Sequence, residues 1–311
     1  AGRSASADSV FDATEHTLLQ HLVTSSGEAR APELWLELAE TRRARHPGDP
    51  EPVAAALRGA IAEPHIGARR AAIHLELARL AAQDGRLDSA RVHARLAFDA
   101  PSSSVSFQAA QLEAELWERD GRLDSAAASY TQWLDARHGV AGARLDAQLA
   151  RALLLEREGR WEQARPEIHA LIGADPYAPR SFRAMLRLVD HHLELDEHGL
   201  AVIEGERALR RLEQTLSSVR DADAQRRARR TRALILESIG RDSAATSAWA
   251  ELWRLYPDQA EGVEGALRGG DLALARLKDR ARAATLWSEL ARRGSREDDR
   301  RQAMTRIAAL P

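Results

Sequence analysis

Three residues of this chain have the types and the spacing of a metal site. His191, Glu194 and His198 would share one face of a helix that ran unbroken through all three. Two imidazoles and a carboxylate form a ligand set that zinc accepts. Position 198 falls at a predicted turn, however, and that turn would carry its ring away from the other two. A polar helix end in contact with solvent explains the same residues. We favour that interpretation and predict no metal and no other cofactor.

A second candidate is the basic run from Arg226 to Arg232, which contains five arginines. Such a run can hold an acidic partner, a phosphate-bearing ligand or RNA. No aromatic residues alternate with the arginines to stack on bases, and Asp221 and Asp223 lie just upstream. The chain has a formal net charge of −2, which gives no general attraction to nucleic acid. We interpret the run as a solvated helix face with charge pairs and do not expect nucleic acid as a partner.

The sequence contains none of the common catalytic motifs that we searched for. It has no phosphate-binding loop motif, no nucleophile-elbow motif and no H-E-x-x-H motif. Gly265, Gly269 and Gly270 lie in a helical context without a preceding strand, which argues against a dinucleotide site. The chain has no cysteine, so thiol nucleophiles and thiolate metal sites are excluded. We predict that the protein is not an enzyme.

The composition favours helices as the elements that position these residues. Hydrophobic residues make up 44% of the chain and are mostly Ala and Leu, which are strong helix formers. No apolar segment has the length of a transmembrane helix. The seven tryptophans recur mostly at positions expected in the core, so packing is their expected role. Trp253 fits this phase least well, and we expect it to be the most exposed.

One short pattern recurs six times: a turn residue, usually followed by Arg, with a small residue five positions after the turn. The six copies are Gly85-Arg86…Ala90, Gly121-Arg122…Ala126, Gly159-Arg160…Ala164, His198-Gly199…Ile203, Gly240-Arg241…Ala245 and Asp279-Arg280…Ala284. Successive starts lie 36, 38, 39, 42 and 39 residues apart. A period in this range is typical of stacked helix pairs. The small residue would sit where two helices cross closely, so Ile203 predicts looser packing in the fourth unit.

The chain divides into three predicted parts. Residues 1–64 contain three predicted helices and form a divergent N-terminal helical cap. The breaker-rich segment 47–52 within this part could instead be a hinge between domains. Residues 65–294 form about six helix pairs, and residues 295–311 form a capping helix over the last pair.

The repeat resembles the tetratricopeptide repeat. Two copies carry the resemblance best, through the residues Gly159, Trp161, Ala164, Ile168, Leu171, Pro176, Gly240, Ala245, Trp249, Leu252 and Pro257. The resemblance covers about residues 66–293, although the spacing is longer than the 34 residues of that family. It implies an all-α, right-handed superhelical solenoid of antiparallel helix pairs.

The resemblance also implies a concave wall, made by the first helix of each pair, that binds peptides or partner domains. By repeat phase, the candidate wall residues are Arg79, Gln83, Gln108, Gln111, Glu115, Arg119, Asp146, Arg157, His192, Arg227, Arg230 and Arg276. Family members that clamp a C-terminal carboxylate use Lys and Asn on this wall. Leu75, Leu149 and Leu188 stand at comparable places here, so we do not expect that clamp.

Our first hypothesis for function is a non-enzymatic scaffold or adaptor that binds other proteins or peptide segments. The alternative is a structural subunit of a larger assembly or an extracellular filament, in which copies or different subunits pack together. A helical accessory domain of an enzyme is a third hypothesis, but no span is left to form the catalytic domain. The start at Ala1 rather than Met would fit signal-peptide removal or trimming, so we expect a periplasmic or extracellular protein of the bacterial envelope, with the cytoplasm as the alternative.

Overall fold

The computed structural model describes residues 2–100, 103–136 and 141–310. These residues form sixteen α-helices and one 3-10 helix, and they contain no strand. The chain divides into two compact units, residues 1–164 and residues 165–311, each of which is described by itself. The all-α class predicted from composition is therefore confirmed.

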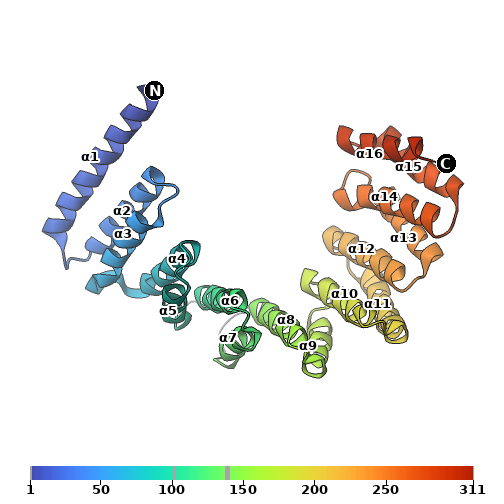
Figure 1. Ribbon diagram of the computed structural model, residues 1–311, viewed down its shortest axis with the longest axis horizontal. Coiled ribbons are helices and arrows are strands. Elements are labelled where there is room, and N and C mark those ends of the chain that lie inside the picture. Colours follow the sequence, from blue (N-terminus) through green and yellow to red (C-terminus); the bar gives the residue numbers. More distant parts are fainter. Residues whose placement is uncertain (1, 101–102, 137–140, 311) are drawn as a thin grey trace. The chain divides into compact units, whose positions relative to one another are not determined.

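Unit 1 is a series of helix pairs that follow the order of the chain (Figure 1). Its elements are α1 (Gly2–Ser25), α2 (Ala31–Arg45), α3 (Pro50–Ala62), η1 (Pro64–Arg69), α4 (Arg70–Gln83), α5 (Leu87–Phe98), α6 (Ser103–Arg119), α7 (Leu123–Asp135) and α8 (Ala141–Arg157). Each helix packs on the next, and α6 also contacts α4 and α8. The first helices of successive pairs therefore lie side by side, as a stacked repeat requires.

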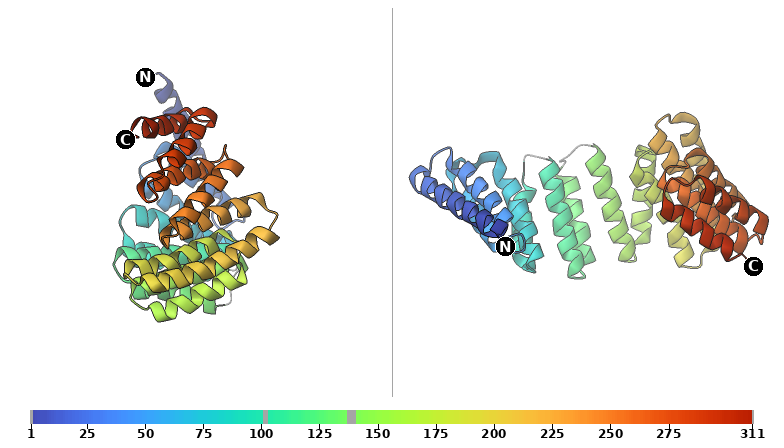
Figure 2. Two further views of the ribbon diagram at one scale, coloured as in Figure 1. Left: turned by 90° about the vertical axis from the view of Figure 1, so that its right-hand side faces the viewer. Right: turned by 90° about the horizontal axis from the view of Figure 1, so that it is seen from above.

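Unit 2 repeats this arrangement, and the boundary between the units falls within α9 (Trp161–Ala174). The helices that follow are α10 (Pro179–Glu194), α11 (His198–Ser218), α12 (Ala222–Ser238), α13 (Asp242–Leu255), α14 (Ala260–Ala275), α15 (Arg280–Arg293) and α16 (Glu297–Ala308). Contacts from α10 to α12 and from α12 to α14 again place first helices next to each other. Figure 2 shows the closely packed orange and red helices at the C-terminal end of this unit.

A residue with a left-handed backbone conformation joins the two helices of each repeated pair. The six joint residues are Gly85, Gly121, Gly159, Asp196, Gly240 and Lys278, with φ from 57° to 75°. At the first joint the amide of Arg86 donates to the carbonyl of Ala81 over 2.9 Å, so the turn satisfies a carbonyl that the helix end leaves free. Glycine reaches this conformation without steric cost, which explains four of the six joints.

The alanine five positions after each joint residue lies in the core. Ala90, Ala126, Ala164, Ala201, Ala245 and Ala283 are all 0% exposed. The predicted phase was wrong in the fourth and sixth copies, because Asp196 and Lys278 take the left-handed conformation there in place of glycine. Ile203 is 54% exposed, and Ala201 fills the close crossing instead, so Ile203 gives no reason for looser packing in the fourth unit.

Close approach of backbones is the role of the glycines on α14. A Cβ at Gly265 would lie 2.5 Å from the carbonyl oxygen of Trp249, and one at Gly270 would lie 2.2 Å from Nε1 of Trp287. No side chain fits at these distances, so α13 and α15 pack directly on the α14 backbone. The prediction for Trp253 was wrong: it is 1% exposed, and its Nε1 donates to Glu289 over 3.0 Å.

Candidate functional site

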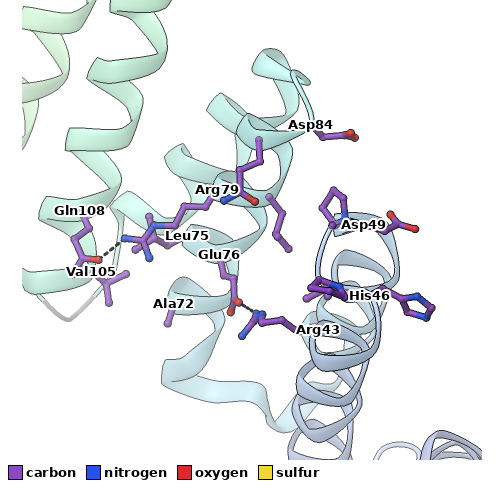
Figure 3. A pocket seen from close by; sticks show the side chains of 16 residues that line it. Arg43, His46, Asp49, Ala72, Leu75, Glu76, Arg79, Asp84, Val105 and Gln108 are labelled. Carbon is purple, nitrogen blue, oxygen red and sulfur yellow. Dashed lines mark hydrogen bonds and ion pairs between the residues drawn. The ribbon is translucent and has the colours of Figure 1, made fainter. Parts of the chain in front are cut away.

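A cleft in unit 1 lies between the α2–α3 loop and the exposed faces of α4 and α6 (Figure 3). We call it the α4–α6 cleft, and its volume is about 750 Å³. Its lining residues are Arg43, His46, Pro47, Gly48, Asp49, Pro50, Val53, Ala72, Leu75, Glu76, Arg79, Leu80, Gln83, Asp84, Val105 and Gln108. The volume is within the range of about 300–1,000 Å³ that ligand-binding pockets occupy.

The floor of the α4–α6 cleft is apolar. Val53 and Leu75 are 2% and 4% exposed, and Leu80 and Val105 are half-buried beside them. Helix periodicity explains this arrangement, because residues 72, 75, 76 and 79 of α4 recur on one helix face. An apolar floor of this kind can accept a hydrophobic side chain from a ligand.

Polar side chains form the rim of the α4–α6 cleft. Arg43 is paired with Glu76 across the cleft and with Glu40, 2.7 Å away on its own helix. Arg79 donates to Oε1 of Gln108 over 2.7 Å, so α4 and α6 are bridged directly (Figure 3). The rim therefore offers both charged groups and amides to a ligand.

Three of the predicted wall residues, Arg79, Gln83 and Gln108, line this cleft. Gln111, Glu115 and Arg119 continue along the same face of α6 and are exposed. The chain thus presents a polar track that leads away from the cleft along one helix.

The other predicted wall residues are placed differently. Asp146 on α8 is half-buried, and Arg157 on the same helix is paired with Glu118. His192 is 4% exposed, and its Nδ1 lies 2.7 Å from Oε2 of Glu197, so its ring faces the interior rather than a partner.

In unit 2 most of the predicted wall arginines have carboxylate partners. Nε of Arg230 lies 2.5 Å from Oε2 of Glu264, and Arg276 lies 2.9 Å from Asp242. Arg227 is half-buried and has no ion pair among the residues that the structure describes.

The basic run of α12 is largely neutralised within the unit. Nε of Arg226 lies 3.0 Å from Glu261, and Arg229 and Arg232 both lie 3.4 Å from oxygens of Glu251. The carboxylates of Glu261 and Glu264 come from α14, so these pairs also tie neighbouring helices together. Four of the five arginines are thus in charge pairs, as the sequence indicated, but their side chains are half-buried rather than solvated and most of their partners lie on α13 and α14.

The three residues considered as zinc ligands do not share a helix. Helix α10 ends at Glu194, and His198 is the first residue of α11. Among the described residues no group of three or more metal-ligating side chains comes together.

Two histidines lie behind the wall of the α4–α6 cleft. Nδ1 of His74 on α4 is 3.1 Å from Nδ1 of His93 on α5, and the rings are stacked with centroids 5.3 Å apart. Burial lowers the pKa of His74, and the charges of His93 and Arg70 lower it further. Burial likewise lowers the pKa of His93, with additional effects from Arg58 and Arg86. One ring must donate and the other accept, so the contact requires that the pair is not fully protonated.

A buried carboxylate ties the helices at the start of unit 2. The Glu204 side chain is 1% exposed and lies 2.8 Å from Arg165, 3.0 Å from Arg207 and 3.4 Å from His169. Desolvation alone would raise the pKa of Glu204, but the hydrogen bond from Arg165 and the surrounding charges outweigh it and lower the pKa. Only about 10 Å³ of free volume lies beside this cluster, so it leaves little room for a ligand.

Sequence reasoning missed the contribution of the α2–α3 loop to the cleft. Arg43 and residues 46–50 form one of its sides, although the segment from Pro47 onward was interpreted as a break between helices or as a hinge between domains. The density of Pro and Gly there was a usable signal, because loops held by rigid helices frequently carry binding residues.

The comparisons with known proteins concern the arrangement of the helices. No protein-family model matches the chain, and no curated protein sequence does either. A tetratricopeptide repeat protein from Parabacteroides merdae is 15% identical over 89% of this chain and 98% of its own, with a TM-score of 0.46. This chain resembles tetratricopeptide repeat proteins.

Two further solved structures are similar in the same way. PilF of Pseudomonas aeruginosa is 18% identical over 77% of this chain and 99% of its own, with a TM-score of 0.42. Yeast Tom70 is 13% identical over 90% of this chain and 59% of its own, with a TM-score of 0.44. Within the part of the chain that the structure describes, no helix is both long enough and apolar enough to span a membrane.

Proposed function

We propose that the protein is a non-catalytic scaffold that holds a segment of a partner protein in the α4–α6 cleft. The observation that carries this proposal is the cleft itself, where an apolar floor lies beneath a rim of arginines and amides. Apolar contact supplies affinity in such a site, and a few polar groups fix the orientation of the ligand.

An extended protein segment fits this cleft better than a small molecule. Small-molecule sites bury about 70–90% of the ligand surface, whereas Ala72, Gln83 and Asp84 on the lining are exposed. The exposed track Gln111, Glu115 and Arg119 continues from Gln108 along α6 and gives a longer ligand further contacts. The proposed binding residues are therefore Arg79, Gln83 and Gln108 in the cleft, followed by these three. That the protein acts in a bacterial envelope stays a prediction.

Peptide selection with the purified full chain tests this proposal. Random twelve-residue peptides displayed on phage would be selected on the chain, and the enriched peptides would be synthesised. Their dissociation constants would be measured by fluorescence anisotropy on the wild type and on Ala72→Trp, in which an indole occupies the exposed side of the cleft. We expect Ala72→Trp to weaken binding by about tenfold or more, since the floor contacts are blocked.

The matched control is Val92→Trp on α5, where Val92 is 59% exposed and lies outside the cleft lining. Circular dichroism and thermal unfolding would verify that both variants fold. Peptides that bind Ala72→Trp and the wild type equally would contradict the proposed site.

A further inference from the structure

We propose that the α4–α6 cleft selects partner segments that place an acidic side chain on Arg79. This inference rests on the proposed function and names the chemistry of the partner. It follows from a difference between the charged side chains of the cleft. Most of them already have a partner of opposite charge within the protein, whereas Arg79 does not.

The charges on the rim of the cleft are nearly all satisfied internally. Arg43 is held by Glu40 and Glu76. Nε of Arg86 lies 2.7 Å from Oδ2 of Asp84. Oδ1 of Asp49 accepts from the amide of Glu51 over 3.1 Å and so caps α3.

Arg79 differs from these groups because its partner is neutral. Its guanidinium meets the amide oxygen of Gln108, and it has no carboxylate partner among the residues that the structure describes. The side chain is exposed, so its charge is available to a ligand. A guanidinium and a carboxylate form a charge-assisted hydrogen bond that is stronger than the bond to an amide.

Elsewhere in the chain, arginines that bridge two first helices have a carboxylate as their partner. Two other arginines also bridge neighbouring first helices, although at other positions along those helices. Arg157 on α8 meets Glu118 on α6, and Arg230 on α12 meets Glu264 on α14. In both of these bridges the acceptor is a carboxylate, whereas Arg79 meets only the amide of Gln108. The missing negative charge is the one we assign to the partner.

The surroundings of Arg79 restrict the partner further. Val105 and Leu75 lie next to the Arg79–Gln108 bridge in the cleft (Figure 3). A segment that places a carboxylate on Arg79 would set a neighbouring apolar side chain against this floor. The expected ligand is thus an extended segment with an Asp or Glu close to a Leu, Val, Ile or Phe.

The test uses the full chain and synthetic versions of the selected peptides, acetylated at the N-terminus and amidated at the C-terminus. These end groups ensure that any carboxylate requirement comes from a side chain. For each peptide a second version carries Asn or Gln in place of the acidic residue. On the wild type we expect the amide version to bind about three- to tenfold more weakly, as the loss of one partly exposed charge pair implies.

Two variants assign that preference to Arg79. Arg79→Gln removes the guanidinium, whereas Gln108→Glu keeps it and supplies an internal carboxylate. Both should bind the acidic and the amide peptides with nearly equal affinity. Arg254→Gln is the matched control, because Arg254 is an exposed arginine on α13 of unit 2 and lies outside the cleft. It should keep the full preference.

The outcomes separate this inference from the proposed function. Peptides that depend on the cleft but bind equally well with Asp or Asn would overturn the acidic preference and leave the scaffold role intact. An acidic preference that persists in Arg79→Gln would equally overturn it. Failure to obtain any peptide sensitive to Ala72→Trp would instead count against the proposed function.

Discussion

The first helices of the two units present different surfaces, although the same type of helix pair repeats in both. In unit 1 the α2–α3 loop, α4 and α6 leave a cleft of about 750 Å³. In unit 2 the glycines of α14 let α13 and α15 pack directly on its backbone. Arg226 and Arg230 on α12 reach across to Glu261 and Glu264 on α14. The same repeat can therefore either leave a cleft open between its helices or close the stack tightly.

The choice between these two arrangements depends on few residues. Where α12 meets α14 in unit 2, the carboxylate of Glu264 completes an ion pair with Arg230. Where α4 meets α6 in unit 1, Arg79 meets only the amide of Gln108. At the close helix crossings of unit 2, the glycines of α14 let neighbouring helices approach, whereas larger side chains would keep those helices apart. Substitutions that exchange the bridging amide for a carboxylate, or a glycine for a larger residue, should therefore change how tightly the helices of each unit pack.

The largest expected effect comes from Gly265→Ala in unit 2. The new Cβ would lie 2.5 Å from the carbonyl oxygen of Trp249, so α13 and α14 must move apart. We expect the free energy of unfolding to fall by about 2–3 kcal/mol, the upper range for overpacking. Urea unfolding followed by circular dichroism measures it. Gly173→Ala on α9 is the control, since nothing lies within 4 Å of its Cβ position. There the gain in helix propensity should leave stability unchanged or raise it slightly.

Glu204→Gln in unit 2 should have the next largest effect. The side chain is 1% exposed, and its loss of charge leaves Arg165 and Arg207 without their carboxylate partner. We expect destabilisation of about 2 kcal/mol in urea unfolding, because breaking a buried ion pair leaves charge uncompensated. Glu118→Gln in unit 1 removes a carboxylate that is 31% exposed from its pair with Arg157. That control should cost less than about 1 kcal/mol, and equal losses would show that the Glu204 cluster has no special role.

Acid should weaken unit 1 through the histidine pair behind the cleft. The pKa values of His74 and His93 are lowered in the folded state, chiefly by burial. The unfolded chain therefore binds more protons below its histidine pKa of about 6.5, and the stability from this pair is present above that value and lost as pH falls. The loss should approach 1.4 kcal/mol per pH unit for each proton that only the unfolded state binds.

Urea unfolding at about pH 7.5 and about pH 5.5 measures this loss. The difference between the two pH values should be smaller in His93→Gln, which removes one titrating ring. His65→Gln, at an exposed position in η1, is the control and should keep the wild-type difference. Equal pH dependence in all three proteins would contradict a role for the pair.

The repeat architecture could be predicted from the sequence because two physical requirements leave clear residue types. A left-handed joint favours glycine, and a close helix crossing requires alanine, so Gly85 with Ala90 and Gly240 with Ala245 were recognisable. The fourth and sixth joints were assigned wrongly because Asp196 and Lys278 adopt the same conformation. At these two joints the hydrogen bonds of the helix end hold the backbone in the left-handed conformation. The residue type therefore does not reveal the position of the joint.

The α4–α6 cleft could be predicted only in part. Repeat phase placed Arg79, Gln83 and Gln108 on one wall, which the structure brings together. It could not show that residues 46–50 close the other side, because a loop path depends on how α2 and α3 pack on α4. Nor could it identify Glu261 and Glu264 as partners of the α12 arginines, since these carboxylates lie more than 30 residues away in sequence.

Glu264→Gln should make the contact between α12 and α14 resemble the contact between α4 and α6. Arg230 would then face an amide, as Arg79 does, and Arg268 would lose a carboxylate 3.4 Å away. We expect a stability loss of about 1 kcal/mol, because the pair is half-buried and bidentate. Thermal unfolding at low and high salt measures it, and the loss should shrink at high salt as charges are screened. A variant as stable as the wild type at low salt would show that the ion pairs between α12 and α14 do not stabilise the packing of these helices.

The reverse exchange, Gln108→Glu, should have the smallest effect on stability. The new carboxylate on α6 would meet Arg79 on α4, where the amide oxygen now lies 2.7 Å from the guanidinium. Because Arg79 is exposed, the gain in the free energy of unfolding should be only about 0.5 kcal/mol and should disappear at high salt. Gln111→Glu, one turn further along the exposed face of α6, adds the same charge without this partner and should give no gain. If both variants gain the same stability, the change in net charge explains the result rather than a bridge to Arg79. The difference between the α4–α6 contact and the α12–α14 contact would then not depend on position 108.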